Sequence, residues 1–288
     1  MRVLVLGASG MAGHMVAVYL QECGHSVTTL SRDVVPFCSG IVHDIRDFSF
    51  LKNCLEKDNY DYVINCIGIL NQNAEKNHDN AVLLNSYLPN WLAKITEHMA
   101  TRIIHLSTDC VFSGNKGKYK ENDLPDGATF YARSKALGEL DDEKNLTFRT
   151  SIIGPDMRRN GIGLFNWFML QSEEVEGYTG AIWSGVSTLV LAQAIALAMQ
   201  EKITGIYHLT NNDCVTKYEL LSLLNQFFRR NNVNIHAVKG VCVDKSLVNT
   251  RTDFTFIVPD YVNMVRDLAE WVRNHPGLYV QYQTLVFD

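Results

Sequence analysis

The chain has 288 residues, of which 47% are hydrophobic and 20% charged, and this composition is typical of a folded globular protein, not a disordered one. With 26 Lys and Arg residues against 31 Asp and Glu, the formal net charge is −5, and no basic run stands out, so no nucleic acid partner is expected. No stretch approaches the roughly 20 apolar residues that span a bilayer, so no membrane association is expected either.

The seven cysteines have no Cys-x-x-Cys spacing, and most lie in apolar strand-like or helix-like surroundings. We therefore expect reduced, packed thiols and a cytoplasmic protein. The chain begins Met-Arg and enters a strand at once, which leaves no room for a signal peptide. The nine histidines are scattered without metal-ligand spacing, so no metal is expected.

The first half of the chain alternates between strand-like and helix-like segments. Apolar runs predict strands at 2–6, 26–30, 41–42, 61–66, 102–106 and 146–150. Helix-length patterns lie between them, at 11–23, 47–58, 77–99 and 130–144. This alternation predicts βαβ units and, with right-handed crossovers, an α/β fold with a Rossmann-like, doubly wound parallel sheet.

After about residue 151 the rhythm changes. Helices are predicted at 164–171, 188–200, 216–228 and 261–274, and a strand at 205–209. No repeat, low-complexity tract or Pro/Ser-rich linker separates the two halves. We predict a dinucleotide-binding domain of residues 1–155 plus about 186–210, and a smaller C-terminal substrate-binding lobe of about 156–185 and 211–288. The cleft between them is the expected ligand site.

A glycine-rich loop, Gly7-Ala-Ser-Gly10-Met-Ala-Gly13, lies directly between the first strand and the first helix. Gly7 allows a tight turn, Gly10 lets a diphosphate approach the backbone, and Gly13 lets the helix and strand pack closely. The helix N-terminus favours the negative charge of that diphosphate. The loop predicts a dinucleotide site, with a merely structural turn as the alternative.

The Gly-x-x-Gly-x-x-Gly spacing resembles the extended branch of the short-chain dehydrogenase/reductase superfamily. Tyr131-Ala-Arg-Ser-Lys135 supplies that superfamily's Tyr-x-x-x-Lys, and Ser107-Thr108 precedes it at the expected distance. The resemblance implies that Tyr131 transfers the proton, Thr108 holds the substrate oxygen and Lys135 binds the cofactor ribose. Because Lys135 lies one helical turn from Tyr131, we expect its ammonium to lower the pKa of the phenol. The resemblance also implies that Asn85 braces the active-site helix, with an ordinary polar helix residue as the alternative.

The end of the second strand bears on the choice of cofactor, because NAD enzymes place an acidic side chain there. Here Ser31 takes the acidic position and Arg32 follows, which favours the 2′-phosphate of NADP(H) over NAD(H). Asp33 is the opposing feature, since it could neutralise Arg32. The resemblance adds an Asp-hydrophobic pair that contacts adenine and a loop after the fourth strand that flanks the cofactor. The predicted cofactor-binding residues are Gly7, Ser9, Gly10, Met11, Ala12, Gly13, Ser31, Arg32, Asp44, Ile45, Cys66, Ile67, Gly68, Tyr131 and Lys135.

Within that branch, about the first 155 residues resemble the dTDP-4-dehydrorhamnose reductases and related sugar-nucleotide reductases. The motifs are Ser107-Thr-Asp-x-Val-Phe-x-Gly114, Tyr131-x-x-Ser-Lys-x-x-Gly-Glu139 and Arg149-Thr-Ser-Ile-Ile-Gly154. Cys110 departs from the tyrosine common there, Ala132 from a glycine, and 177–188 lacks the Gly-x-Pro-Thr element. The implied function is NADP(H)-dependent reduction of the keto group of a nucleotide-linked deoxysugar, for polysaccharide precursors. The implied substrate contacts are Thr108, Asp109, Cys110, Val111 and Trp183.

Several alternatives stay open. A nucleotide-sugar epimerase or dehydratase uses the same scaffold, and a non-catalytic NADP-binding regulatory subunit would keep the fold, although the intact Thr108, Tyr131 and Lys135 set argues against the latter. Two arginine pairs, 158–159 and 229–230, either meet the substrate diphosphate or are exposed charge. A homodimer is an open expectation.

Overall fold

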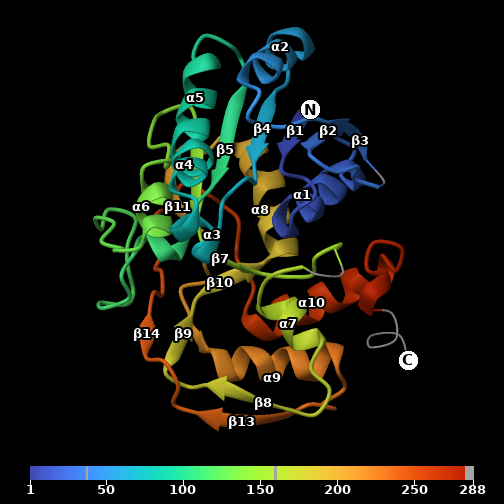
Figure 1. Ribbon diagram of the computed structural model, residues 1–288, viewed down its shortest axis with the longest axis vertical. Helices are drawn as coiled ribbons and strands as arrows, with labels where there is room; N and C mark the ends of the chain where they lie inside the picture. Colours follow the sequence, from blue (N-terminus) through green and yellow to red (C-terminus); the bar gives the residue numbers. More distant parts are fainter. Residues whose placement is uncertain (37, 159–160, 283–288) are drawn as a thin grey trace.

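The computed structural model of the protein describes residues 1–36, 38–158 and 161–282 and is organised around one seven-stranded parallel sheet (Figure 1). The strand order is β3-β2-β1-β4-β5-β6-β11, and every neighbouring pair is parallel. The order reverses between β1 and β4, and this switch point is where doubly wound sheets bind ligands. The strands are β1 (Arg2–Leu6), β2 (Ser26–Ser31), β3 (Ser39–Val42), β4 (Tyr62–Asn65), β5 (Arg102–Leu106), β6 (Leu146–Arg149) and β11 (Gly205–His208).

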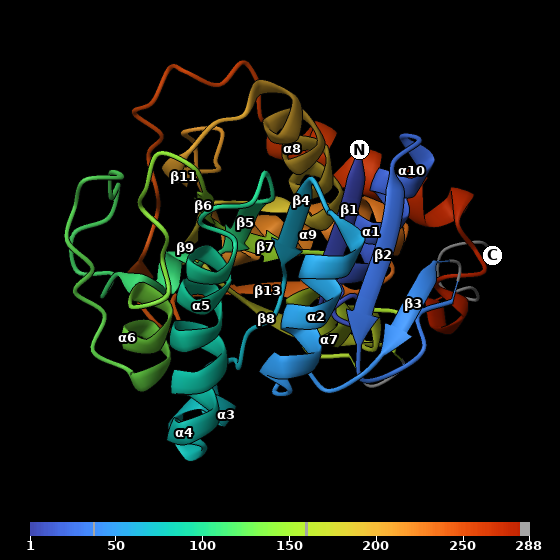
Figure 2. The same cartoon turned by 90° about the horizontal axis from the view of Figure 1, so that it is seen from above.

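Helices cover both faces of this sheet (Figure 2). Successive residues of β1 point to opposite faces, so Val3 and Val5 pack under one helical layer and Leu4 and Leu6 under the other. The first layer contains α1 (Met11–Glu22) and α8 (Thr188–Glu201). The second contains α2 (Phe48–Asp58) and α5 (Leu88–Ile95). The predicted doubly wound α/β fold is confirmed.

Two predicted helices of this half are broken or shortened. In place of one helix over 77–99, the chain forms α4 (His78–Ala81), a π-helical turn η1 (Val82–Tyr87) and α5, after the unpredicted α3 (Asn71–Lys76). The helix predicted over 130–144 is α6 (Phe130–Ala136). Two residues later Gly138 lies against the Asn85 carbonyl, where a Cβ atom would meet the oxygen at 1.9 Å, so only glycine fits there.

The rest of the chain forms the C-terminal lobe, below the sheet in Figure 1. The predicted helices are present as α7 (Leu164–Met169), α9 (Lys217–Phe228) and α10 (Tyr261–Asn274), and Thr216 and Glu219 form the predicted capping box. The short strands of the lobe were not predicted. They pair as β10 (Gly185–Ser187) with β7 (Ser151–Ile153), β13 (Asn234–Val238) with β8 (Glu174–Tyr178), and β9 (Ala181–Trp183) with β12 (Val215–Thr216) and β14 (Val243–Asp244).

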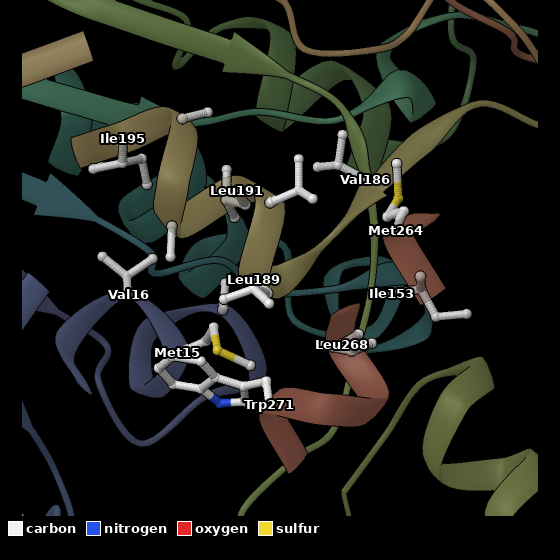
Figure 3. Packing of buried hydrophobic residues seen from close by; sticks show 14 of the residues in the cluster. Met15, Val16, Ile153, Val186, Leu189, Leu191, Ile195, Met264, Leu268 and Trp271 are labelled. Atoms are coloured by element: carbon white, nitrogen blue, oxygen red, sulfur yellow. The ribbon is translucent and has the colours of Figure 1, made fainter. Parts of the chain in front are cut away.

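The sheet half and the lobe share one buried core where α1, α8 and α10 meet (Figure 3). Met15 and Val16 of α1, Leu189 of α8, and Leu268 and Trp271 of α10 all belong to this cluster. The helix that follows the glycine loop is thus held between the sheet and the lobe.

Candidate active site

The glycine loop is built as the sequence predicts. Gly7 has a positive φ of 77°, and a Cβ atom there would lie 2.8 Å from Ile67 Cγ1, in the loop after β4. A Cβ atom at Gly13 would lie 2.3 Å from the Gly7 carbonyl oxygen, so only glycine lets α1 begin this close to the turn. Gly10 is the N-cap of α1, with open space above its backbone, since only the Gly7 oxygen lies within 4 Å of its Cβ position. This cradle fits a diphosphate at the helix N-terminus.

The remaining loop residues line the same turn. Ser9 and Met11 are half-buried and Ala12 is buried at the first turn of α1. Cys66, Ile67 and Gly68 follow β4, next to β1 in the sheet, so the structure brings these two predicted segments together.

The ends of β2 and β3 carry the residues predicted to bind the adenosine. Ser31 is buried, and its hydroxyl donates to the Asp33 carbonyl at 2.6 Å, while Arg32 is exposed beside it. Asp44 forms a bidentate ion pair with Arg46, which lowers the pKa of Asp44 to about 2. Ile45 is buried in the core under α2, so its side chain packs against the protein.

Thr108, Tyr131 and Lys135 converge from two segments. Thr108 follows β5 and caps the short helix η2 (Asp109–Val111), where its Oγ1 accepts from Cys110 N at 3.1 Å. Tyr131 and Lys135 lie one turn apart on α6, and all three side chains are buried. The Thr108 hydroxyl lies near the Tyr131 phenol and acts to lower the pKa of that phenol.

The expected lowering of the Tyr131 pKa by Lys135 is wrong for this structure. Burial raises the pKa of the Tyr131 phenol above its ordinary value, the neighbouring Cys110 raises it further, and the Thr108 hydroxyl lowers it. Lys135 instead directs its Nζ to the Leu106 carbonyl at 2.6 Å and to His105 Nε2 at 3.2 Å. The phenol is therefore held protonated.

Asn85 braces the active-site helix through its side chain. It is fully buried in the π-helical turn η1, and its Nδ2 donates to Ser134 Oγ on α6 at 3.0 Å. The same amide bonds both backbone groups of Ile69, accepting at 2.7 Å and donating at 2.9 Å. A π-bulge at a functional position is common, and here the Asn85 side chain joins the loop after β4 to α6.

The predicted substrate residues fall into two groups. Asp109, Cys110 and Val111 form η2 beside Thr108, and burial raises the pKa of the Cys110 thiol to about 11. Val111 is completely buried. Trp183 is 3% exposed and its Nε1 donates to Ser151 Oγ at 2.8 Å, so the structure places it in the core of the lobe.

Sequence reasoning missed two lysines of the lobe that approach η2. Lys217 begins α9, and its Nζ lies 5.8 Å from the centre of the Trp183 ring. Burial raises the pKa of Asp109, its bond with Thr108 lowers it, and the charges of Lys245 and Lys217 lower it as well. Neither lysine belongs to a motif, and only the fold brings them beside Thr108.

Sequence reasoning also missed Glu75, whose Oε1 accepts from the Tyr131 backbone N–H at 3.0 Å. It lies on α3, a helix with no capping signal that distinguishes it from a loop. Glu75 satisfies one of the free N–H groups in the first turn of α6, beside the Thr129 side chain that caps the helix.

The arginines considered for the substrate diphosphate have other partners. Arg229 Nη1 donates to the carbonyl oxygens of Phe168, Met169 and Gln171, so it binds α9 to the end of α7. Arg158 pairs with the buried Asp156. Arg159 lies outside the described residues.

Within residues 1–36, 38–158 and 161–282, no three His, Cys, Asp or Glu side chains gather closely enough to hold a metal ion. In the same part of the chain no helix has the length and apolar character needed to cross a membrane.

Comparisons with known proteins identify the family. The family described as RmlD substrate binding domain matches residues 1–245. The spore coat polysaccharide biosynthesis protein SpsK of Bacillus subtilis is 26% identical over 229 residues, covering 77% of this chain and 78% of that protein. The dTDP-4-dehydrorhamnose reductase of Burkholderia thailandensis is 28% identical over 226 residues, 73% of each.

A solved structure agrees in fold. The dTDP-4-dehydrorhamnose reductase of Bacillus anthracis, in complex with NADP, superposes with a TM-score of 0.78 at 20% identity over 93% of this chain and 98% of that one. The predicted resemblance to extended short-chain dehydrogenases/reductases of the sugar-nucleotide type is confirmed. The chain belongs to the RmlD substrate-binding-domain family.

Proposed function

We propose that this protein is a reductase that converts the keto group of a nucleotide-linked deoxysugar to a hydroxyl with NADPH, as the relatives named dTDP-4-dehydrorhamnose reductase do. The observation that carries the proposal is the joint presence of a glycine cradle after β1 and a buried pair of neighbouring hydroxyls, Thr108 after β5 and Tyr131 on α6. Both lie at the carboxyl ends of strands of one parallel sheet, so a cofactor in the cradle and a substrate at Tyr131 meet at the switch point.

The residues supply the proton chemistry of such a reduction. NADPH, when bound, supplies the hydride for the carbonyl carbon. Tyr131 holds the proton that the carbonyl oxygen takes up, and its raised pKa keeps that proton in place until the oxygen becomes negative. Thr108 orients the same oxygen, and Lys135 binds the cofactor ribose from one turn along α6.

Net consumption of NADPH distinguishes this reductase from its alternatives. Purified protein is mixed with a dTDP-4-keto-6-deoxyhexose and excess NADPH, and absorbance and product are followed together. We expect one NADPH oxidised per sugar converted. Conversion at constant NADPH would instead indicate an epimerase or dehydratase that recycles its hydride, and no conversion of any nucleotide sugar would favour a regulatory subunit.

We also propose NADP(H) over NAD(H) as the cofactor. The position where an NAD enzyme carries an acid is Ser31, whose hydroxyl is occupied by the Asp33 carbonyl. Arg32 is exposed next to Ser31, where its guanidinium can reach a 2′-phosphate. The Asp44 carboxylate is paired with Arg46, so its negative charge adds little repulsion toward a 2′-phosphate.

The cofactor proposal is tested with Arg32→Ala. Loss of a charge-assisted bond should weaken NADPH binding by about ten- to a hundredfold and leave NADH binding nearly unchanged, measured by fluorescence titration. Arg266→Ala, which removes an exposed arginine of α10 paired with Asp267, is the matched control and should leave the affinity for both cofactors unchanged. Equal losses for both cofactors in Arg32→Ala would contradict the assignment.

We also propose a cellular compartment and an assembly state. All seven cysteines are free thiols, which supports a reducing, cytoplasmic location. We keep the homodimer as a proposal that sedimentation equilibrium tests directly, with a mass near 32.5 kDa as the contrary result.

A further inference from the structure

Three buried polar side chains form a row that ends at Lys135, one turn along α6 from Tyr131. Asn65 at the end of β4 lies opposite His105 of β5 in the parallel register, and Lys135 of α6 lies beyond His105. Asn65 Nδ2 is 3.1 Å from His105 Nδ1, and His105 Nε2 is 3.2 Å from Lys135 Nζ. The proposed reaction uses Lys135 alone of these three, so the role of the other two needs a separate account.

The backbone settles which way the Asn65 amide points. Asn65 Oδ1 accepts from the Ile67 N–H at 3.2 Å, so the amide nitrogen faces His105. Because that nitrogen is a donor, His105 Nδ1 must be the acceptor, and a neutral imidazole then carries its hydrogen on Nε2. That N–H is directed at Lys135 Nζ.

The lysine nitrogen responds differently in its two protonation states. An ammonium has three hydrogens and no lone pair, so it cannot accept from the His105 N–H. A neutral amine accepts from His105 and donates to the Leu106 carbonyl at 2.6 Å, so both imidazole nitrogens have partners of the right kind. Protonating Lys135 forces the imidazole into its other tautomer and sets its N–H against the Asn65 amide, an unmade bond in a buried place.

We propose that His105 is a positioning residue that, held in one tautomer by Asn65, presents its N–H to Lys135 and favours the neutral amine. Lys135 then gains or loses a proton within the working pH range. The row and the burial of the amine together set the pH at which it does so. The kinetic consequence rests on the proposed reductase function, whereas the titration of Lys135 does not.

The charges around Lys135 fit this arrangement. Burial lowers the pKa of Lys135 to about 8, while Glu139 on the segment after α6 and Cys66 after β4 raise it. Glu139 is itself paired with Arg149 at 2.6 Å, which weakens its pull on the lysine. Burial, and then the Lys135 charge, hold the pKa of His105 well below its ordinary value, so the imidazole is neutral.

The test titrates Lys135 by NMR of protein labelled with 13C at the lysine ε carbon, without cofactor, and Lys135→Met assigns the signal. His105→Gln can turn its amide oxygen toward the ammonium, so we expect the midpoint of Lys135 to rise by about 1 to 2 pH units. Asn65→Leu leaves the imidazole free to change tautomer, and its midpoint should rise as well. If His105→Gln fails to fold, Asn65→Leu decides the matter.

His208→Gln is the matched control. His208 is also a buried histidine on a parallel strand, but it faces the Tyr119 and Val248 carbonyls and Arg149, so Lys135 should titrate as in the wild type. An unchanged or lower Lys135 midpoint in a folded His105 or Asn65 variant overturns the proposal.

A kinetic arm separates this inference from the proposed function. In the NADPH assay, the limb of the kcat–pH profile that reports Lys135 should move with its NMR midpoint in His105→Gln, with KM for the sugar unchanged. If no nucleotide sugar is reduced, the proposed function fails while the NMR result still decides the role of His105.

Discussion

The inner strands of the large sheet and the outer strands of the C-terminal lobe differ in burial. β4 and β6 are buried at every position, whereas β8 alternates exposed and buried residues and β13 is buried at none. β12 and β14 have two residues each. The sheet therefore gives a rigid edge on which Thr108 and the glycine loop are fixed, while the lobe is a set of short pieces joined by helices and side chains.

The difference assigns separate tasks to the two regions. The described side chains proposed to act on the reacting atoms all come from the sheet half, while the lobe contributes Lys217 and Lys245 near η2 and the partner surface for α1. Substitutions in the sheet half should thus alter the chemistry or the global stability of the protein. Substitutions in the lobe should increase local opening of the lobe.

The largest expected effect is on the chemistry of the sheet half. Tyr131→Phe removes the proposed proton donor and keeps the ring that packs against Ala74 and Ala81. We expect kcat to fall by about 10² to 10⁴ with little change in NADPH affinity or melting temperature, measured by NADPH oxidation and calorimetry. Activity near the wild-type level would assign the proton to another group.

The buried ion pair of Arg149 and Glu139 should matter most for stability. Glu139 accepts from Arg149 Nε at 2.7 Å and from Ser107 Oγ at 2.6 Å, and both charged side chains are at most 4% exposed. Glu139→Gln leaves the guanidinium buried without its counter-charge, so we expect a loss of about 3–5 kcal/mol in urea unfolding. Glu97→Gln, which breaks the exposed pair with Lys94, is the control and should leave the midpoint unmoved.

The same contrast explains what the sequence could predict. Continuous apolar runs such as β1 and the loop Gly7 to Gly13 carry local signals strong enough to predict the sheet half and its motifs. The lobe strands were missed because segments such as β12, with two residues, have no periodicity to read. The site was predicted where motifs exist, but Lys217, Glu75 and His105 acquire their roles only through tertiary contacts.

The direction of the Tyr131 pKa shift could not be predicted from the sequence for the same reason. A spacing of one helical turn places Lys135 near the phenol, but the sequence does not reveal that the Leu106 carbonyl and His105 hold its nitrogen. Burial then decides the shift. The π-helical turn η1 was not predicted either, because residues 82–87 carry no local signal that distinguishes it from an ordinary helix.

The third prediction concerns the joint between the two regions. His14 of α1 is buried, with Nδ1 3.0 Å from the Gly10 carbonyl and Nε2 3.0 Å from the Tyr279 hydroxyl near the C-terminus. Burial lowers the pKa of His14 to about 4. Between pH 6.5 and 4 the unfolded chain binds a proton that the folded chain does not, so stability falls as the pH falls through this window.

The measurement is urea unfolding from pH 7 to pH 4. The shift of His14 corresponds to about 3 kcal/mol lost by pH 4, and His14→Gln should remove that part of the slope. Buried His105 and His208 contribute to the slope in both proteins, so the difference between the two curves isolates His14. Parallel curves would show that His14 does not couple the joint to pH.

The smallest effect belongs to the lobe itself, where one side chain joins two helices. Arg229 near the end of α9 donates from a single Nη1 to three carbonyl oxygens at the end of α7, the shortest bond being 2.7 Å to Gln171. Arg229→Met keeps most of the apolar stem but removes the donor to the Met169 and Gln171 carbonyls, so we expect a loss of about 1.5–3 kcal/mol. Because the lobe is assembled from short pieces, the loss should appear as local opening: hydrogen exchange should speed up in α7 while the amides of β1 and β4 stay protected. Arg273→Met is the control, since Arg273 is exposed and bonds only the Phe227 carbonyl among the described contacts, and its effect should be smaller. Exchange that accelerates equally in α7 and β4 would mean that the lobe and the sheet unfold as one unit, and the contrast between the two regions would then apply to their chemistry alone.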